Sequence, residues 1–220
     1  MPTPRFRTVV FDCDSTLSAI EGIDELAAGR REVIAALTDA AMRGEVPLEN
    51  VYGARLRLIR PDRAAVEAIA RRYIAEAVPG ARETVRQLRA HGVEVRILSG
   101  GLRQAILPFA EWLGLSPTVV RAVDIHFDAA GAFFEFDEQS PLARSGGKLA
   151  VMRRWRSMLP RPILMVGDGI TDLEARPAVD RFIAFAGVVE RAAVTAAADA
   201  VIRTPSLLPV LEEVLHTPAG

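Results

Sequence analysis

The stretch from Val9 to Thr16, with the sequence VVFDCDST, limits the possible folds of this chain more than any other. Its β-branched and aromatic start is typical of a buried parallel strand, which would deliver two carboxylates to the sheet edge where ligands bind in open α/β folds. Because side chains alternate along an extended backbone, Asp12 and Asp14 can face one site while Cys13 points away. Two such acids can act as a nucleophile or metal ligand and as a proton donor. Taken alone, the pair is more often part of an Asp-rich turn.

Composition and charge restrict the class of protein. The 220 residues are 50% hydrophobic and 25% charged, which is typical of one or two folded domains with a sizeable core. The formal net charge of -1 gives no reason to expect nucleic acid or a membrane surface as a partner. No apolar run approaches the roughly 20 residues of a membrane span, and the amino terminus lacks a hydrophobic signal core. We therefore expect a cytoplasmic protein in which the single cysteine, Cys13, is a buried spectator.

A helical segment follows Thr16 and continues for about sixty residues without another strongly β-branched run. Residues 48–59 carry apolar side chains at helical spacing, with Arg55 inside the apolar stripe and Arg57 on the opposite face. An arginine in such a stripe either snorkels to solvent or binds a ligand. Pro79 and Gly80 end the segment. This pattern predicts an inserted helical unit.

From Ala81 onward, helical and strand patterns alternate, which favours a parallel sheet with helices on both faces. We predict an α/β fold with a doubly wound parallel-sheet, Rossmann-like core made of residues 1–16 and 79–220, and an inserted helical cap domain made of residues 17–78. The predicted strands after the cap are residues 93–98, 119–122, 162–166, 182–185 and 201–202, with a hairpin at 125–127 and 133–136. The predicted helices after the cap are residues 81–90, one that begins near 147, an alanine-rich stretch at 192–200, and 207–215.

Four segments after the predicted strands carry side chains that suit phosphoryl chemistry. A phosphoryl group requires hydroxyl and backbone N–H donors, a cation, and usually a hard metal held by carboxylate oxygens. Glycines allow the backbone to approach a phosphate closely, and a lysine can neutralise both a nucleophilic carboxylate and the phosphoryl oxygens. The segments are Asp12 with Asp14, Ser99 with Gly100 and Gly101, Lys148, and Asp168 with Asp172.

The order and spacing of seven motifs resemble those of the haloacid-dehalogenase-like phosphatases, and among these the phosphoserine phosphatases. The resemblance covers nearly the whole chain. The motifs are FDCDST at 11–16, EGIDELA at 21–27, AMRG at 41–44, RL at 55–56, LSGG at 98–101, SGGK at 145–148 and GDGITD at 167–172.

The resemblance implies a set of roles in the phosphate half of the site. Asp12 is the nucleophile that becomes an aspartyl-phosphate, and Asp14 is the acid and base. The implied cofactor is Mg²⁺, held by Asp12, Asp168 and the Asp14 backbone carbonyl. Asp172 would not bind the metal directly but would support the residues that do. The phosphate oxygens would be held by Ser99, Gly100, Gly101 and Lys148, with Thr171 beside them.

The resemblance also implies a substrate-reading half contributed by the cap. Glu21 would bind the amino group and Arg55 the carboxylate of the substrate, with Met42 and Arg43 lining the pocket. The implied activity is the hydrolysis of O-phospho-L-serine to L-serine and phosphate, the last step of serine biosynthesis.

Two alternatives remain open at this point. One keeps the mechanism but changes the substrate to another small phosphomonoester, or the acceptor from water to a hydroxy amino acid. The other is a phospho-acceptor signalling module, against which Asp14 and the helical insert both argue. We expect a small-molecule phosphomonoester as the partner, neither nucleic acid nor a membrane, and either a monomer or a homodimer.

Overall fold

Strand β1 (Thr8–Phe11) lies in the middle of a six-stranded sheet with the order β3-β2-β1-β6-β7-β8. The structure is a computed structural model that describes residues 3–27, 34, 36–37, 39–40, 43 and 45–215. Thr8 is paired with Glu94 on one side and Ile163 on the other, and every strand pair in this sheet is parallel. The other strands are β2 (Glu94–Leu102), β3 (Val120–Val123), β6 (Ile163–Gly167), β7 (Arg181–Phe185) and β8 (Ala200–Ile202).

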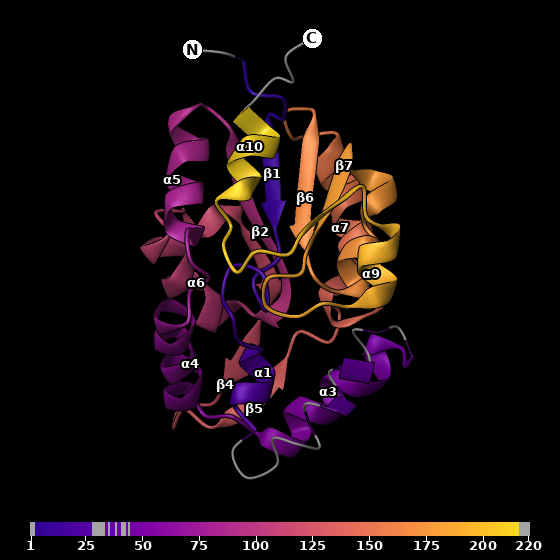
Figure 1. Ribbon diagram of the computed structural model, residues 1–220. Helices are drawn as coiled ribbons and strands as arrows, with labels where there is room; N and C mark the ends of the chain where they lie inside the picture. Colours follow the sequence, from indigo (N-terminus) through magenta and orange to yellow (C-terminus); the bar gives the residue numbers. More distant parts are fainter. Residues whose placement is uncertain are drawn as a thin grey trace.

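The helices of the core lie on either side of this sheet, as the alternating pattern predicted. In Figure 1, α5 and α6 lie beside the β2 half of the sheet and α7 and α9 beside the β6 and β7 half. The predicted α/β fold class is confirmed. These helices are α5 (Ala81–Ala90), α6 (Arg103–Trp112), α7 (Gly147–Arg156), α8 (Ile170–Leu173), α9 (Ala192–Ala197) and α10 (Pro209–Leu215), with short 3-10 turns η1 (Pro117–Val119), η2 (Pro141–Ala143) and η3 (Arg176–Ala178).

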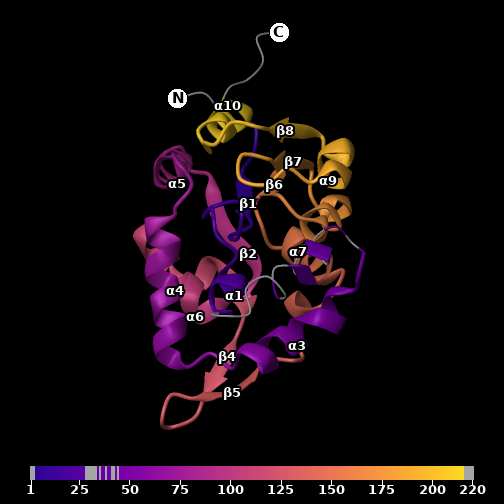
Figure 2. The same ribbon diagram turned by 60° about the horizontal axis from the view of Figure 1, so that its bottom comes forward.

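The inserted segment between β1 and α5 includes helices that lie beyond the carboxyl ends of the strands; those with described bounds are α1 (Gly22–Glu25), α3 (Leu48–Ile59) and α4 (Arg63–Ala75). The arrows of β1 and β6 point toward α1 and α3 (Figure 1), and Figure 2 shows these helices from below with the β4–β5 hairpin beside α3. The hairpin is antiparallel and consists of β4 (Ile125–Phe127) and β5 (Phe133–Phe136), as predicted.

Helix α4 packs along the core helix α6. The ring of Tyr73 on α4 stacks on Phe109 of α6 with 5.8 Å between ring centroids. The two connections of the inserted segment also run side by side, because Val78 donates its backbone N–H to Leu17 at 3.0 Å. One continuous cluster of buried apolar side chains joins the insert to the core. The domain limits at 16/17 and 78/79 therefore stay a prediction.

Two predicted element bounds were wrong. Strand β2 continues past the expected end at Leu98, because Leu102 pairs with Val123 after a break in the register. Ser99, Gly100 and Gly101 thus belong to an irregular strand end, and α6 begins only after it. The alanine-rich stretch predicted as one helix instead ends as a helix at Ala197 and enters β8 at Ala200.

Candidate active site

The parallel sheet brings three of the predicted site segments to one edge. The backbone N–H of Asp12 donates to the carbonyl of Val166 on β6 at 2.9 Å, which holds the residue after β1 beside the end of its neighbour. Asp168 follows the last residue of β6, and Ser99 lies near the end of β2 on the other side of β1. All three side chains are buried. The carboxyl edge of the sheet is therefore the floor of the site.

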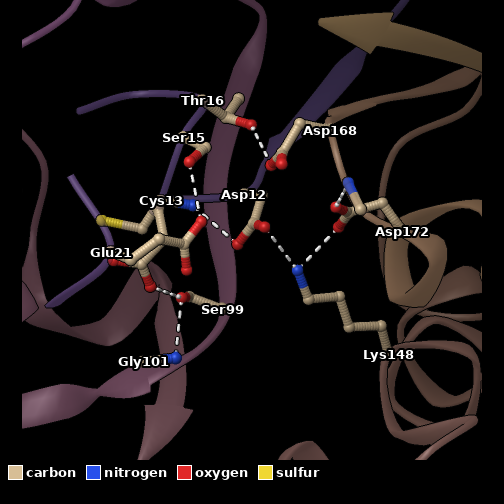
Figure 3. Close-up of polar contacts among 12 residues, drawn as sticks. Asp12, Cys13, Ser15, Thr16, Glu21, Ser99, Gly101, Lys148, Asp168 and Asp172 are labelled. Atoms are coloured by element: carbon tan, nitrogen blue, oxygen red, sulfur yellow. Dashed lines mark hydrogen bonds and ion pairs between the residues drawn. The ribbon is translucent and has the colours of Figure 1, made fainter. Parts of the chain in front are cut away.

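Lys148 lies between two carboxylates of this floor (Figure 3). Its Nζ is 2.8 Å from Oδ2 of Asp12 and 2.6 Å from Oδ1 of Asp172. Burial would lower the pKa of Lys148, but the charges of Asp12 and Asp172 outweigh this effect and raise it. The ammonium group is therefore held in its charged form where it can neutralise a nucleophile and the phosphoryl oxygens.

Three acids form a candidate metal site. Asp12, Asp168 and Asp172 each offer a carboxylate oxygen, and these oxygens lie within 4.8 Å of one another. Burial, followed by the charge of Asp12, raises the pKa of Asp168 to about 7, and the same two causes raise the pKa of Asp172. A hard divalent cation would relieve this excess of negative charge, and oxygen donors are the ligands that such ions prefer. The residues present therefore fit a divalent metal.

Asp168 and Asp172 differ in their position relative to the pocket. Asp172 is fully buried, and its two oxygens accept hydrogen bonds from Lys148 and from the backbone N–H of Gly169 at 3.0 Å. Asp168 lines the pocket, and its two oxygens accept the hydroxyl of Thr16 and Nε of Arg191, each at 3.2 Å. The position of Asp168 at the pocket suits a metal ligand, and that of Asp172 suits a residue that supports the ligands.

Asp14 is held by two donors from the inserted segment. The hydroxyl of Tyr73 donates to Oδ1 at 2.6 Å, and the backbone N–H of Gly22 donates to the same oxygen at 2.9 Å. Burial, followed by the charge of Asp12, raises the pKa of Asp14 to about 6, whereas these two hydrogen bonds oppose the rise. A carboxyl group with this pKa can give up and take back a proton near neutral pH.

The glycine-rich end of β2 packs directly against Asp14. The hydroxyl of Ser99 donates to Oδ2 of Asp14 at 3.4 Å. It also accepts the backbone N–H of Gly101 at 2.9 Å (Figure 3). A Cβ atom added at Gly101 would lie 2.7 Å from Oδ2 of Asp14, so any side chain there would displace the acid. Ser99 itself is fully buried and is not among the described residues that line the pocket.

Most of the predicted site residues line one pocket. It lies between the sheet edge, α1 and α3. The side chains of Ile23, Leu48, Tyr52, Leu142 and Arg144 complete its wall. The predicted residues that line it are Asp12, Asp14, Glu21, Arg55, Gly100, Gly101, Lys148, Asp168 and Thr171.

The cap residues expected to read the substrate have different positions. Glu21 lines the pocket and accepts the hydroxyl of Ser15 at 2.7 Å. Arg55 is 3% exposed, as the helical spacing predicted, and its guanidinium is 3.8 Å from Asp24. Arg43 is not at the pocket, because its guanidinium forms an exposed ion pair with Glu45 at 2.7 Å. Met42, the other expected cap residue, lies outside the described residues.

A family model described as haloacid dehalogenase-like hydrolase matches residues 6–180 of the sequence. The chain belongs to this family. Membership agrees with the parallel sheet, the paired aspartates after its first strand, and the helical insert.

Curated relatives of this hydrolase include two phosphoserine phosphatases. The chloroplastic enzyme of Arabidopsis thaliana is 43% identical over 196 residues, which cover 87% of this chain and 66% of the relative. The enzyme of Bos taurus is 40% identical over 186 residues, 83% of each chain. A solved structure of a phospho-aspartyl intermediate analogue of phosphoserine phosphatase superposes with a TM-score of 0.81 at 26% identity, covering 94% of this chain and 98% of that one.

Two residues beside the predicted site acids, Arg191 and Tyr73, have contacts that the sequence does not predict. Arg191 is 7% exposed, and its Nε lies 3.2 Å from Oδ2 of Asp168 while another guanidinium nitrogen is 3.8 Å from Glu21. It comes just before the short helix α9 and belongs to no periodic pattern, so nothing in the sequence marked it. Tyr73 is buried on α4, but the helical spacing of apolar residues carries no information about the partner of its hydroxyl.

Proposed function

We propose that this hydrolase cleaves O-phospho-L-serine to L-serine and phosphate through a covalent aspartyl-phosphate on Asp12. The observation that carries the proposal is the placement of two different acids in one pocket. Asp12 is paired with Lys148, whereas Asp14 is held by neutral donors and has a raised pKa. One is suited to attack and the other to proton transfer.

In the first half of the reaction, a carboxylate oxygen of Asp12 attacks the phosphorus atom. The bond between phosphorus and the serine oxygen breaks, and Asp14 gives its proton to that oxygen so that serine leaves as the neutral alcohol. Lys148 is close enough to Asp12 to balance the charge of both the carboxylate and the transferred group. The products of this step are serine and the aspartyl-phosphate.

In the second half, a water molecule attacks the phosphorus atom of the aspartyl-phosphate. Asp14, which lost its proton in the first half, accepts one from this water. The bond between phosphorus and Asp12 then breaks, which releases phosphate and restores the starting state of both acids. The same carboxyl group therefore acts as acid and then as base.

We propose Mg²⁺ as the metal, held by Asp12, Asp168 and the backbone carbonyl of Asp14. A divalent cation at this place supplies positive charge to the phosphoryl oxygens and reduces the repulsion between them and the acids. Mg²⁺ favours a few carboxylate ligands together with substrate phosphate, which is the donor set that this pocket offers.

Glu21 and Arg55 are proposed to bind the amino acid part of the substrate. Both line the pocket, and they carry opposite charges. Burial and the nearby charge of Asp14 raise the pKa of Glu21, so an ammonium group would stabilise its charged form. Arg55 can offer the two parallel N–H donors that a carboxylate accepts.

Substrate profiling tests this assignment. Phosphoglycolate lacks the ammonium group, so Glu21 would lose the partner that the substrate supplies, and the loss of one partner of a buried pair costs roughly 2 to 5 kcal/mol. We expect kcat/KM to favour phosphoserine by about 30-fold or more. Arg55→Lys should reduce this preference, whereas Arg57→Ala should not, because Arg57 is exposed and pairs with Glu138. Equal kcat/KM for both substrates would refute the phosphoserine assignment and leave the phosphatase assignment intact.

The finer expectations from the sequence belong to the same proposal. Transfer to a hydroxy amino acid would appear as labelled phosphoamino acid when free serine is added, and a signalling module would show a long-lived phosphoenzyme. Within the described ranges, no helix has both the length and the apolarity that a bilayer span requires. The cytoplasmic location and the choice between monomer and homodimer stay predictions, which cell fractionation and analytical ultracentrifugation would test.

A further inference from the structure

The chain contains two tyrosines, and both join the insert to the floor of the site. Tyr52 on α3 donates its hydroxyl to the carbonyl of Gly100 at 2.8 Å. Tyr73 on α4 donates its hydroxyl to Oδ1 of Asp14 at 2.6 Å. Both side chains are at most 1% exposed. Each of these buried tyrosines therefore makes a hydrogen bond from the insert to the floor.

Two neighbours besides Asp14 fix the position of the Tyr73 hydroxyl. The tyrosine ring stacks on Phe109 of α6, and Phe109 in turn stacks on Trp112 with 5.8 Å between centroids. The backbone of Gly22 lies against the hydroxyl, because a Cβ atom at this glycine would lie 2.0 Å from the tyrosine oxygen. A hydroxyl held in this way is a fixed donor and not one that finds its partner by rotation.

The two oxygens of Asp14 consequently have different environments. Oδ1 accepts two hydrogen bonds, one from Tyr73 and one from the backbone N–H of Gly22, and these occupy both of its lone pairs. Among the described residues, Oδ2 accepts only one hydrogen bond, a long one from the hydroxyl of Ser99 at 3.4 Å. A proton carried by Asp14 is thus placed on Oδ2, on the side of the glycine-rich strand end that lines the pocket.

We propose that Tyr73 is a positioning residue that reserves Oδ1 of Asp14 as an acceptor and thereby directs the transferable proton, on Oδ2, toward the leaving oxygen of the substrate. This inference rests on the proposed role of Asp14 as the proton donor. It adds a specific contribution of the inserted segment to catalysis: α4 orients the acid in addition to enclosing the substrate.

Tyr52 provides a matched control within the same chain. Like Tyr73, it is a buried tyrosine of the insert whose hydroxyl bonds across to the floor. Its partner is a backbone carbonyl, and no hydrogen bond joins it to Asp14 among the described residues. Removing either hydroxyl loosens the insert, but only the change at Tyr73 alters the orientation of the acid.

The test compares Tyr73→Phe with Tyr52→Phe on two substrates, phosphoserine with an alkyl leaving group and nitrophenyl phosphate with an activated aryl one. The rate of phosphoenzyme formation is measured in single turnovers, because the second half-reaction is common to both. In Tyr73→Phe, phosphoenzyme formation should be about 10- to 100-fold slower with phosphoserine and less than about threefold slower with the aryl ester. The loss with phosphoserine is a part of the about 10²- to 10⁴-fold that acid–base catalysis contributes. Tyr52→Phe should slow both substrates by the same factor.

Asp14→Asn separates the inference from the proposed function. If this variant slows both substrates equally, Asp14 is not the proton donor and the proposed mechanism fails. If it slows phosphoserine selectively but Tyr73→Phe slows both equally, or neither, the role of Tyr73 is refuted. Should Tyr73→Phe fail to fold, Gly22→Ala takes its place, since its Cβ would displace the tyrosine hydroxyl. A selective loss with phosphoserine supports the inference, and equal losses overturn it.

Discussion

Lys148 lies 2.8 Å from the carboxylate of Asp12 and is the only lysine in the chain. Every other one of the 27 lysine and arginine residues is an arginine. A lysine ammonium is a compact point charge, whereas a guanidinium is a wide planar fork. Nζ of Lys148 contacts both Asp12 and Asp172 within 2.8 Å, so the space between these acids suits a compact ammonium group.

The first prediction is that Lys148→Arg is severely damaging although the charge is kept. The guanidinium cannot occupy the place of the ammonium without moving Asp12 or Asp172. We expect kcat to fall by about 10²- to 10³-fold, the usual effect of removing one donor to a developing charge. Arg153→Lys, an exposed residue on the same helix, is the matched control and should leave kcat unchanged. Near wild-type turnover of Lys148→Arg would contradict the assigned role.

Much of this site follows from local patterns in the sequence. The apolar stripe of residues 48–59 predicted that Arg55 points inward and Arg57 outward. In the structure Arg55 is 3% exposed, and Arg57 lies on the surface. The run Val9–Phe11 is fully buried, as a central parallel strand should be. These outcomes depend only on side-chain periodicity within one element, which a sequence displays directly.

Contacts between distant elements could not be predicted in this way. Arg191 reaches Asp168 from the start of α9, and Tyr73 reaches Asp14 from α4, 59 positions along the chain. Such pairs arise from how the helices pack on the sheet. Nothing in the local sequence around Arg191 or Tyr73 indicates that its side chain contacts a site acid. The predicted end of β2 at Leu98 was also wrong. Glycines weaken a strand, but here Leu102 pairs with Val123 beyond the two glycines, after a shift in the register.

The second prediction concerns the metal. A chelator should abolish turnover, and Mg²⁺ should restore it and raise the thermal midpoint. At 100 times its dissociation constant, a ligand adds about 2.7 kcal/mol, or about 5–10 °C for a chain of this size. Asp168→Asn should lose this shift, whereas Glu111→Gln, on the exposed face of α6, should keep it. Ca²⁺ should also raise the midpoint but support little turnover, because its looser coordination misplaces the nucleophile. Full activity in excess chelator would be incompatible with this site.

The third prediction is that the metal-free protein loses stability as the pH rises through the weakly acidic range. The pKa values of Asp14 and Asp168 are raised from 3.8 to about 6 and about 7, so between these limits the folded chain binds more protons than the unfolded one. The free energy of unfolding therefore falls from about pH 4 to about pH 7 by several kcal/mol, because each unit of pKa shift corresponds to about 1.4 kcal/mol. Acids whose pKa is lowered by arginines, such as Asp180, act in the opposite sense and at lower pH.

Urea unfolding in the presence of a chelator, at several pH values between 4.5 and 7.5, measures this effect. Asp168→Asn should flatten the dependence, since the amide cannot take up a proton. Asp128→Asn, in the exposed turn of the β4–β5 hairpin, should retain the wild-type slope. A free energy of unfolding that rises over this range in the wild-type protein would show that the buried acids are not held with raised pKa values.

The most direct test of the account is to trap the phosphoenzyme. The protein is mixed with phosphoserine labelled in its phosphoryl group and quenched with acid within one turnover, and the labelled peptide is identified by mass spectrometry. We expect one hydroxylamine-labile phosphoryl group, on Asp12, and none in Asp12→Asn. A label on any other residue, or an Asp12→Asn variant that still turns over phosphoserine, would contradict it.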